Sequence, residues 1–382
     1  MNNSSETAWI IEEANALGFD LCGVVRAEKF PELNLTKEWL ARGYAGEMQY
    51  LSDQRRDDPQ TVMPGLHSVI VCALNYNSPA QRSVDALPLE QAEPRGWVSR
   101  YAWGQDYHEV LQQKLRELAG RLPKRFPEPF QARIYADTGP LNERVFAKHA
   151  GLGWLGKNTL LLNPKLGSWF FLGAILTTLD IPPTLGPAEL PSPDFCGSCT
   201  KCIDACPTGA LVEPYVMDSR LCISYLTIEL RGSIPEELRE PMGRHVFGCD
   251  ICQDVCPWNR RASVTHAEEF QPRIFPIITQ SEPRELFAAV TQENGEESLF
   301  LPRLESLAGM DEEQFRKIFR GSPIKRTKWR GLVRNACIAL GNSALVPGST
   351  RHERVCSLLK GLSTSPEPLI AESAQWALSR IQ

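Results

Sequence analysis

The sequence has little that would place the protein in or across a membrane. Its longest apolar run, residues 169–176 with a few neighbours, is far shorter than the roughly 20 residues of a transmembrane helix. The chain begins MNNSSETAW, which lacks the charged and apolar regions of a signal peptide. We therefore expect a cytoplasmic protein without a membrane segment.

A strong charge bias and a dinucleotide-binding motif are missing as well. The net charge is only -5 over 382 residues, so overall charge does not predict a nucleic-acid partner. No G-x-G-x-x-G follows a predicted strand, which leaves a dinucleotide-binding fold without support. The length and the apolar content of 42% are typical of a globular protein with two or three domains.

Cysteine, by contrast, is concentrated, because eight of the 12 cysteines lie between Cys196 and Pro257. The first run, C-x2-C-x2-C-x3-C-P, is the bacterial ferredoxin signature, in which the fourth cysteine binds the other cluster of the pair. The second run is C-x2-C-x3-C-P from Cys249, and Cys222 lies 27 residues before it, which indicates an insertion. The pattern predicts two [4Fe-4S] clusters with crossed ligands, one on Cys196, Cys199, Cys202 and Cys256 and one on Cys206, Cys222, Cys249 and Cys252.

Two other uses of these cysteines are less consistent with the spacing. Zinc sites also use C-x2-C pairs, but they need neither a third cysteine nor a terminal Cys-Pro. Disulfides would not persist in the reducing cytosol. The four remaining cysteines lie in apolar surroundings and are expected to be buried thiols: Cys22, Cys72, Cys337 and Cys356.

Hydrophobic periodicity predicts three regions along the chain. Residues 1–181 are expected to form an α/β domain, with helices near 5–17, 35–42, 106–122 and 140–150 and strands near 21–25, 69–74, 133–136 and 169–177. Five prolines in residues 181–193 indicate a linker into a ferredoxin-like module over 182–265. Residues 266–382 are expected to be all-α, and similar segments at 334–341 and 372–379 indicate a HEAT-like helical pair.

Two motifs in the α/β region could carry chemistry. Asp137 follows a predicted strand, where ligands of open α/β sheets bind, and is a candidate acid; alternatively it caps a helix that begins near Pro140. The loop from Gly151 to Thr159 nearly matches the phosphate-binding G-x4-G-K-[ST], but Asn158 replaces the hydroxyl residue and a helix precedes the loop. We interpret it as a glycine-rich approach to a large ligand.

A basic stretch lies near the start of the last predicted helices. Residues 316–334 contain eight Lys or Arg and no acid, although the chain is acidic overall. This composition is typical of a surface that contacts phosphates, and we expect Lys325, Arg326, Lys328 and Arg330 to contact a phosphate backbone. The alternative is a basic edge that pairs with the acidic residues 311–313.

Six segments together resemble the epoxyqueuosine reductase family, in order along residues 10–260. They are Asp137-Thr-Gly-Pro, Gly151-Leu-Gly-Trp-Leu-Gly-Lys-Asn, Gly167-Ser-Trp-Phe, the first cysteine run, Cys222-Ile-Ser-Tyr-Leu-Thr-Ile-Glu and Gly248-Cys-Asp-Ile-Cys-Gln-Asp-Val-Cys-Pro-Trp-Asn. The resemblance implies an enzyme that uses cobalamin and two [4Fe-4S] clusters to reduce epoxyqueuosine to queuosine in the tRNA anticodon. It also implies a nitroreductase- and reductive-dehalogenase-like cobalamin-binding domain.

The resemblance assigns roles to particular residues. Asp137 would be the proton donor, and the other cobalamin contacts would be Arg100, Lys157, Asn158, Ser168, Ser224 and Tyr225. No Asp-x-His-x-x-Gly motif is present, since the segment from Asp106 to Leu111 lacks the glycine, so cobalamin is expected base-off without a histidine ligand.

A rival interpretation comes from a different class of protein. The cysteine signature alone would also suit a ferredoxin-type electron-transfer protein without cobalamin. As an enzyme, the chain is expected to act as a monomer and to take electrons from a low-potential donor that the sequence does not identify.

Overall fold

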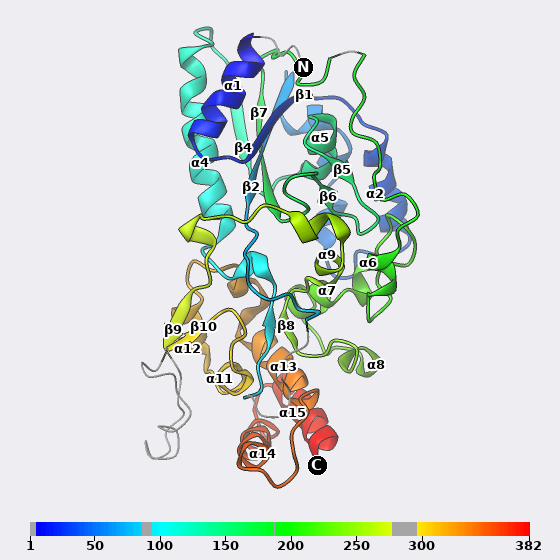
Figure 1. Ribbon diagram of the computed structural model, residues 1–382, viewed down its shortest axis with the longest axis vertical. Coiled ribbons are helices and arrows are strands. Elements are labelled where there is room, and N and C mark those ends of the chain that lie inside the picture. The colour runs from blue at the N-terminus through cyan, green and yellow to red at the C-terminus, as the bar shows by residue number, and fades with distance from the viewer. Residues whose placement is uncertain (1–4, 86–92, 187, 277–295) are drawn as a thin grey trace.

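The computed structural model describes residues 5–85, 93–186, 188–276 and 296–382. The molecule is elongated, with an α/β region at one end, helices α13 to α15 at the other, and the cysteine-bearing segments between them (Figure 1). No helix within these described ranges combines the length and the apolar character that crossing a bilayer requires.

A four-stranded antiparallel sheet forms the centre of the α/β region. Its strands are β1 (Leu21–Arg26), β2 (Ser68–Asn75), β7 (Phe170–Thr177) and β4 (Ala132–Tyr135), in that spatial order. β2 pairs with β7 along its whole length, and every residue of β2 is buried. The strands predicted from apolar runs are therefore confirmed.

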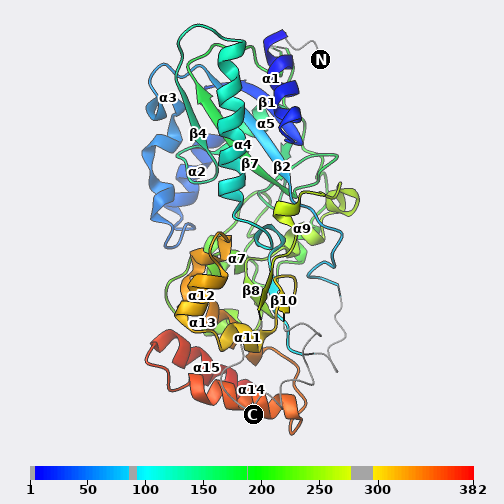
Figure 2. The ribbon, with the colours of Figure 1, turned by 90° about the vertical axis from the view of Figure 1, so that its left-hand side faces the viewer.

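Helices cover both faces of this sheet. α1 (Ser5–Ala16) and α4 (Tyr107–Arg121) pack on the face that carries Ile70 and Ile175, and Figure 2 shows α4 running across the sheet. α5 (Glu143–His149) packs on the opposite face, against Val71 and Ala174. The apolar residues divide between the two faces because successive side chains of a strand point in opposite directions.

Short elements extend the α/β region, and the linker runs along it. They are α2 (Glu32–Ala41), α3 (Pro59–Val62), β5 (Trp154–Leu155) and β6 (Leu161–Leu162). The start of the proline-rich linker follows the edge strand, since the Thr184 N–H donates to the Val24 carbonyl (2.8 Å) and the Val24 N–H donates to the Thr184 hydroxyl (2.7 Å).

The cysteine-bearing segments contain only short elements. These are α6 (Lys201–Asp204), α7 (Ile223–Ile228), α8 (Glu236–Arg239), β8 (His245–Phe247) and α9 (Ile251–Asp254). The two short helices within the cysteine runs, α6 and α9, lie against each other. α7 and α8 lie in the insertion between Cys206 and Cys249, as the spacing of the cysteines indicated.

The last region is largely but not wholly helical. It contains α11 (Leu304–Ala308), α12 (Glu312–Ile318), α13 (Lys328–Gly341), α14 (Thr350–Leu362) and α15 (Pro368–Ile381). β9 (Ile274–Pro276) pairs with β10 (Glu296–Ser298), so the expectation of an all-α region was wrong at this point. The two strands are short and pair across 20 residues of chain. Such pairing leaves no periodic pattern in the sequence, so the two strands were not predicted.

The two similar segments, 334–341 and 372–379, lie in α13 and α15, which pack against each other. Their contact is close at Gly341, where a Cβ atom would come within 2.9 Å of the Ala377 Cα. The repeated small residues thus serve the contact between two helices, and the HEAT-like assignment stays a prediction.

Residues 97–103 belong to the expected first region but pack against the second and third regions. β3 (Trp97–Val98) pairs with β8 in parallel, and Ala102 and Trp103 join the core of the last helices. This segment leaves the α/β region and returns to it at α4, so it ties the expected first and third regions together.

Candidate active site

The structure brings Cys256 close to cysteines of the first run. The pKa of the Cys202 thiol is raised to about 11, first by burial and then by the nearby thiols of Cys256 and Cys196. Burial also raises the pKa of the Cys256 thiol, and the nearby Cys199 thiol raises it further. Cys256 thus lies beside the three cysteines of the first run, although at least 54 residues separate it from them in the chain.

The second group also assembles around Cys222. Burial raises the pKa of the Cys249 thiol well above its usual range, and Cys252 and Cys222 raise it further. After burial and hydrogen bonding, the pKa of Cys222 responds to the thiol of Cys206. All of these thiols are free rather than disulfide-bonded. Two sets of four free thiols fit two iron–sulfur clusters, whose ligands are cysteine thiolates.

The insertion between Cys206 and Cys249 places the N-terminus of α7 beside the second thiol group. Cys222 directly precedes α7, and the backbone N–H groups of Ser224 and Tyr225 donate to its sulfur. The Tyr225 hydroxyl accepts from the Glu47 N–H (2.9 Å), which joins α7 to the α/β region. In the structure, Ser224 and Tyr225 therefore contact the second thiol group and the α/β region.

The glycine-rich loop lies against the cysteine segments. Lys157 Nζ donates to the carbonyls of Gly197 (2.5 Å) and Cys199 (3.1 Å), and Asn158 Nδ2 donates to the carbonyl of Cys252 (3.4 Å). These contacts hold the loops of both thiol groups, as a glycine-rich approach to a large group requires.

Ser168 also faces the cysteine segments. Its hydroxyl accepts from Gln253 Nε2 (3.0 Å) and Asn259 Nδ2 (2.9 Å). Both donors flank Cys256, so Ser168 orients the second cysteine run.

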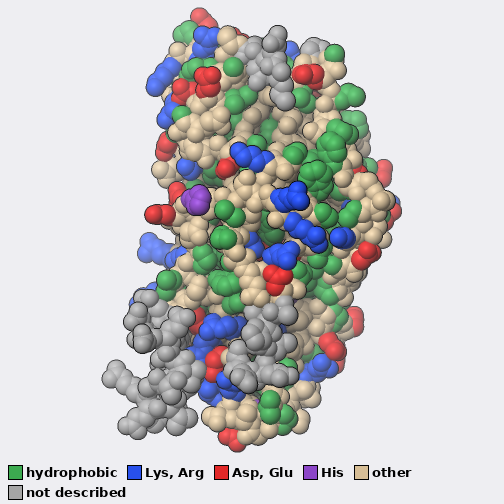
Figure 3. Space-filling model, in the orientation of Figure 1, with side chains coloured by type: hydrophobic (Ala, Val, Ile, Leu, Met, Phe, Trp, Pro, Cys, Tyr) green, Lys and Arg blue, Asp and Glu red, His purple; other side chains and the backbone are tan. Residues whose placement is uncertain are grey.

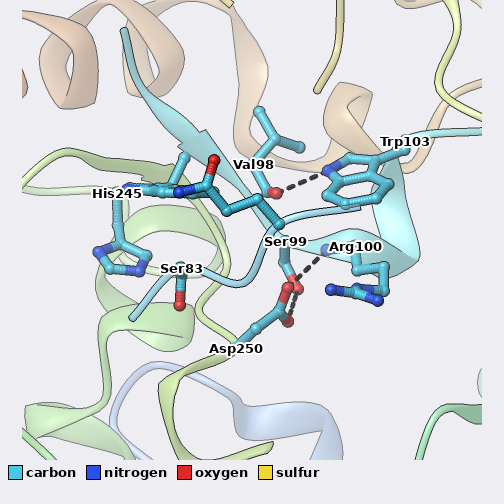
Figure 4. A pocket seen from close by; sticks show the side chains of 9 residues that line it. Ser83, Val98, Ser99, Arg100, Trp103, His245 and Asp250 are labelled. Carbon is cyan, nitrogen blue, oxygen red and sulfur yellow. Dashed lines mark hydrogen bonds between the residues drawn. The ribbon is translucent and has the colours of Figure 1, made fainter. Parts of the chain in front are cut away.

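Arg100 lies in a tight, buried pocket beside the second thiol group (Figure 4). Its backbone N–H donates to Asp250 Oδ2 (2.7 Å), and Ser99 donates to the other oxygen of the same carboxylate. The guanidinium bonds to the Asn77 side chain (2.8 Å) and stacks 4.7 Å from the Trp169 ring. The structure therefore uses Arg100 to fix the backbone beside Cys249.

A large cavity lies between the α/β region and the last helices, and its volume is about 1210 Å³. Residues near the ends of β4 and α4 line one wall, residues 312–329 line the other, and Ile228 and Glu229 at the end of α7 complete it. Arg100, Lys157, Asn158, Ser168, Ser224 and Tyr225 are not among its lining residues, whereas Asp137 is. Of the predicted cofactor contacts, the structure thus brings Asp137 alone to this cavity.

Asp137 lies on the cavity wall with 63% of its side chain exposed. Its backbone adopts φ 62°, and this left-handed turn directly after β4 directs the chain along the cavity. Its carboxylate accepts from the Tyr107 hydroxyl (2.6 Å) and lies 3.4 Å from His108 Nε2. The capping alternative was wrong, because α5 begins at Glu143 with Asn142 at its N-cap.

His108 connects Asp137 to an ion pair between a buried carboxylate and an exposed lysine. Its Nδ1 lies 2.7 Å from the Asp106 carboxylate, which also bonds to Lys325 Nζ at 2.7 Å. Asp106 is also the N-cap of α4, so the helix start fixes the whole row of side chains.

The pKa values follow from this row. Burial lowers the pKa of His108, but hydrogen bonds to Asp106 and Asp137 outweigh it and raise the pKa to about 9. For Asp137, burial raises the pKa, yet the hydrogen bonds from His108 and Tyr107 outweigh burial and leave it below its ordinary value. A carboxyl held protonated by burial alone would have a raised pKa, and the structure shows the reverse.

Nothing in the sequence indicated that Tyr107 and His108 would meet Asp137. Asp137 lies 30 and 29 positions after them, at the end of a strand rather than on their helix, and only the fold brings the two together. A tyrosine and a histidine in the first turn of a helix that has an Asp N-cap were the available signal.

The basic residues of 316–334 differ in whether they form ion pairs. Lys325 and Arg326 line the cavity but pair with Asp106 and with Glu229 (2.9 Å), not with residues 311–313. Lys328 also lines the cavity, and Lys328 and Arg330 are exposed and have no ion-pair partner among the described residues. The neighbouring helix start therefore presents both paired and unpaired cations.

Arg334 and Arg316 depart from the expected phosphate surface. Arg334 is 1% exposed and donates to the carbonyls of Leu226 (2.6 Å) and Gly232 (2.6 Å), so it belongs to the core. Arg316 pairs with Glu312 (2.7 Å), which is the one ion pair with residues 311–313 that the described residues form.

The double set of thiols and the acid–base row beside a large cavity define an iron–sulfur oxidoreductase. Residues 195–259 match the family described as "4Fe-4S double cluster binding domain", and residues 56–138 match "Epoxyqueuosine reductase QueG, DUF1730". The chain is 43% identical over 339 residues to the epoxyqueuosine reductase of Gloeobacter violaceus, which covers 88% of this chain and 96% of that relative. The chain belongs to the epoxyqueuosine reductase family.

Solved structures of this family share the fold over 98% of this chain. A crystal structure of epoxyqueuosine reductase with a tRNA-Tyr epoxyqueuosine-modified stem loop has a TM-score of 0.80 at 30% identity and is covered to 89%. The enzyme from Bacillus subtilis, with the catalytic loop that carries an aspartate swung out of the active site, has a TM-score of 0.77 at 29% identity and is covered to 90%.

Proposed function

We propose that this protein reduces epoxyqueuosine to queuosine in the anticodon of tRNA, with two [4Fe-4S] clusters and cobalamin as cofactors. The observation that carries the proposal is the row Asp106–His108–Asp137 on the wall of a cavity whose opposite wall is basic. Relatives that carry this name, one of them solved with a modified tRNA stem loop, support the same assignment.

The residues present fit both kinds of cofactor. The two sets of thiols suit the clusters, and α7 leads from Cys222 to Ile228 and Glu229 on the cavity wall. The cavity has room for a large planar ligand, and the Tyr50, Tyr101 and Phe315 rings beside it provide apolar contacts. Bound cobalamin would supply a cobalt centre able to pass electrons to the epoxide carbon.

A base-off cofactor without a histidine ligand also fits this cavity. Among the described residues that line it, His108 is the one histidine. Both of its ring nitrogens lie within hydrogen-bond or ion-pair distance of carboxylates, Nδ1 of Asp106 and Nε2 of Asp137. Its nitrogens are thus committed to the acid–base row.

The acid–base row can supply the protons of the reaction. Loss of the epoxide oxygen as water consumes two electrons and two protons per substrate. His108, with a pKa of about 9, is protonated at neutral pH, and its Nε2 can pass a proton to Asp137. Asp137 then gives the proton to the departing oxygen, and Tyr107 holds the carboxylate in place through its hydroxyl. The low pKa of Asp137 makes this supply from His108 necessary.

The basic wall suits the tRNA backbone. We propose that Lys325, Arg326, Lys328 and Arg330 contact phosphates, while the modified base enters the cavity as an unstacked nucleotide. A monomer in the cytoplasm, where tRNA is modified, would suffice for this function, and the electron donor would be a low-potential carrier.

One experiment tests the whole proposal. Anaerobically reconstituted protein is incubated with epoxyqueuosine-containing tRNA, cobalamin and a low-potential reductant, and the nucleosides are analysed by mass. Conversion to queuosine that requires added cobalamin is expected. If cobalamin neither binds nor changes turnover while the iron–sulfur absorption is intact, the ferredoxin-type alternative replaces the proposal.

The crossed ligand sets have their own test. Replacing Cys222 with Ala should remove roughly half of the iron, because one of two clusters loses a ligand. Cys337→Ala, which removes a buried thiol that belongs to neither cysteine run, serves as the control for iron content. Parental iron content in Cys222→Ala would remove Cys222 from the ligand set.

A further inference from the structure

A smaller cavity lies on another face of the molecule, over the two short helices of the cysteine segments. Its volume is about 440 Å³, and three segments line it: residues 82–84, residues 201–205 and residues 254–260. Lys and Arg side chains gather on this face around α6 and α9 (Figure 3). It shares no lining residue with the large cavity that contains Asp137.

This smaller cavity lies directly outside the thiols. Two of its lining residues, Lys201 and Val255, are the chain neighbours of Cys202 and Cys256 in the first thiol group, and a third, Ala205, is the neighbour of Cys206 in the second. The second group lies on the path to the large cavity, because Cys222 leads into α7. Electron transfer weakens steeply with distance, so a donor at the smaller cavity would reach the first group, and the second group would relay electrons inward.

Most of the unpaired charges on this face are positive, with Asp204 the exception among the described residues that line the cavity. Lys201, Arg260 and Arg261 are exposed, and within the described part of the chain none of them forms an ion pair or a side-chain hydrogen bond. Arg82 pairs with Asp85 at 3.0 Å, so its charge is partly compensated.

Of the two acids that line this cavity, one is buried and the other accepts a hydrogen bond from a neutral hydroxyl. Asp254 is buried and accepts from the Ser83 N–H (2.8 Å) and hydroxyl (2.6 Å). The Asp204 carboxylate accepts from the Thr200 hydroxyl (2.7 Å). In a chain with a net charge of -5, this face therefore presents positive charge to a partner.

We propose that this basic face is the docking site for an acidic one-electron carrier protein, which reduces the cluster held by Cys196, Cys199, Cys202 and Cys256. The inference rests on the proposed function, since it requires clusters that accept electrons. Each docking event oxidises one reduced carrier and reduces one cluster by one electron, so two events supply the two electrons of one epoxide reduction. Complementary charge speeds such encounters, and electron-transfer complexes are typically small and transient.

The test compares two reductants on one variant. Photoreduced flavodoxin, an acidic carrier, and reduced methyl viologen, a small cation that needs no docking, are mixed with the protein in a stopped-flow instrument, and bleaching of the iron–sulfur absorption is followed. In Lys201→Glu/Arg260→Glu, the second-order rate with flavodoxin should fall about tenfold or more, and its dependence on ionic strength should flatten. The rate with methyl viologen should not fall.

Controls separate docking from damage to the clusters. Lys124→Glu/Lys360→Glu makes the same change of charge at exposed positions away from this face and should behave as the parent. An unchanged flavodoxin rate in Lys201→Glu/Arg260→Glu, or an equal loss with both reductants at parental iron content, overturns the proposal. If that variant loses iron, Arg260→Glu/Arg261→Glu, which leaves the neighbour of Cys202 intact, gives the same comparison.

Failure of the proposed function would give a different result. Turnover of epoxyqueuosine-containing tRNA driven by methyl viologen tests the reaction without the carrier. No turnover in this assay, together with charge-dependent reduction by flavodoxin, would reject the proposed function and retain the docking site. Normal turnover with charge-independent reduction by flavodoxin would do the opposite.

Discussion

The two walls of the large cavity come from distant parts of the chain and differ in how their charges are held. On the α/β wall, Asp106, His108 and Asp137 form one hydrogen-bonded row, in which each group shifts the pKa of the next. On the helical wall, Lys328 is exposed without an ion-pair partner among the described residues, as is nearby Arg330. Coupled groups suit proton transfer, whereas unpaired cations suit phosphate contacts, so in the proposed function the two walls would separate chemistry from substrate binding.

The largest expected effect is on the α/β wall, at Asp137. Asp137→Asn keeps the shape of the side chain but cannot carry the proton, so turnover should fall at least about a hundredfold, the scale of general acid catalysis. Binding of cobalamin and tRNA and the iron content should stay as in the parent. Single-turnover assays with saturating cofactor measure the loss, and Asp180→Asn, at an exposed ion pair elsewhere, is the control. Near-parental turnover would remove Asp137 from the chemistry.

A smaller loss is expected when the proton supply is removed. His108→Gln keeps a hydrogen-bonding side chain without a titratable proton, and turnover should fall about tenfold to a hundredfold, at or below the low end of general acid catalysis. In the parent, turnover should decline as the pH rises through about 9, because His108 then loses its proton. This decline should be absent from the pH profile of His108→Gln.

The control for this prediction is His67→Gln, at an exposed histidine outside the cavity. His67→Gln should keep the parental turnover and its decline as the pH rises through about 9. If the decline of turnover at alkaline pH persists in His108→Gln, another group supplies the proton. The α/β wall would then not differ from the helical wall through a coupled proton supply.

On the helical wall, effects on tRNA affinity should depend on whether a cation is already paired. Lys328→Ala/Arg330→Ala should weaken binding and reduce the slope of log affinity against log salt by about 1.5, since each phosphate contact contributes roughly 0.7 to 0.9. Lys325→Ala/Arg326→Ala should change the slope less, because their ion pairs with Asp106 and Glu229 already replace counterions in the free protein. Filter binding at several salt concentrations measures both slopes. Equal slopes in the two variants would contradict the distinction.

The smallest effect is expected at Glu229, the partner of Arg326. Glu229→Gln should leave Arg326 unpaired and strengthen tRNA binding by a factor of up to about five, since partly exposed pairs contribute up to roughly 1 kcal/mol. Turnover at saturating tRNA should not change. Weaker binding in Glu229→Gln would show that the carboxylate positions Arg326 for the phosphate rather than competing with it.

The sequence predicted the site unevenly. The eight cysteines could be grouped from their spacing, because the wrapping of a cluster by a short loop is a local property, and the structure brings the two cysteine runs together. Asp137 could be proposed as an acid but not distinguished from a helix cap, since both interpretations depend on the same residues. The contacts of Arg100, Lys157, Asn158 and Ser168 with the cysteine segments could not be predicted at all.

By itself, the sequence determined the strands and helices of the α/β region, the two cysteine runs and the insertion between Cys206 and Cys249. These features depend on periodicity and spacing over short stretches, which local chain geometry controls. Only the tertiary structure decided that the first turn of α4 meets the end of β4, that Lys325 reaches Asp106, and that Arg334 is buried. Those outcomes depend on how sheet and helices pack across hundreds of residues, and a pKa such as that of His108 is set by neighbours that packing alone selects.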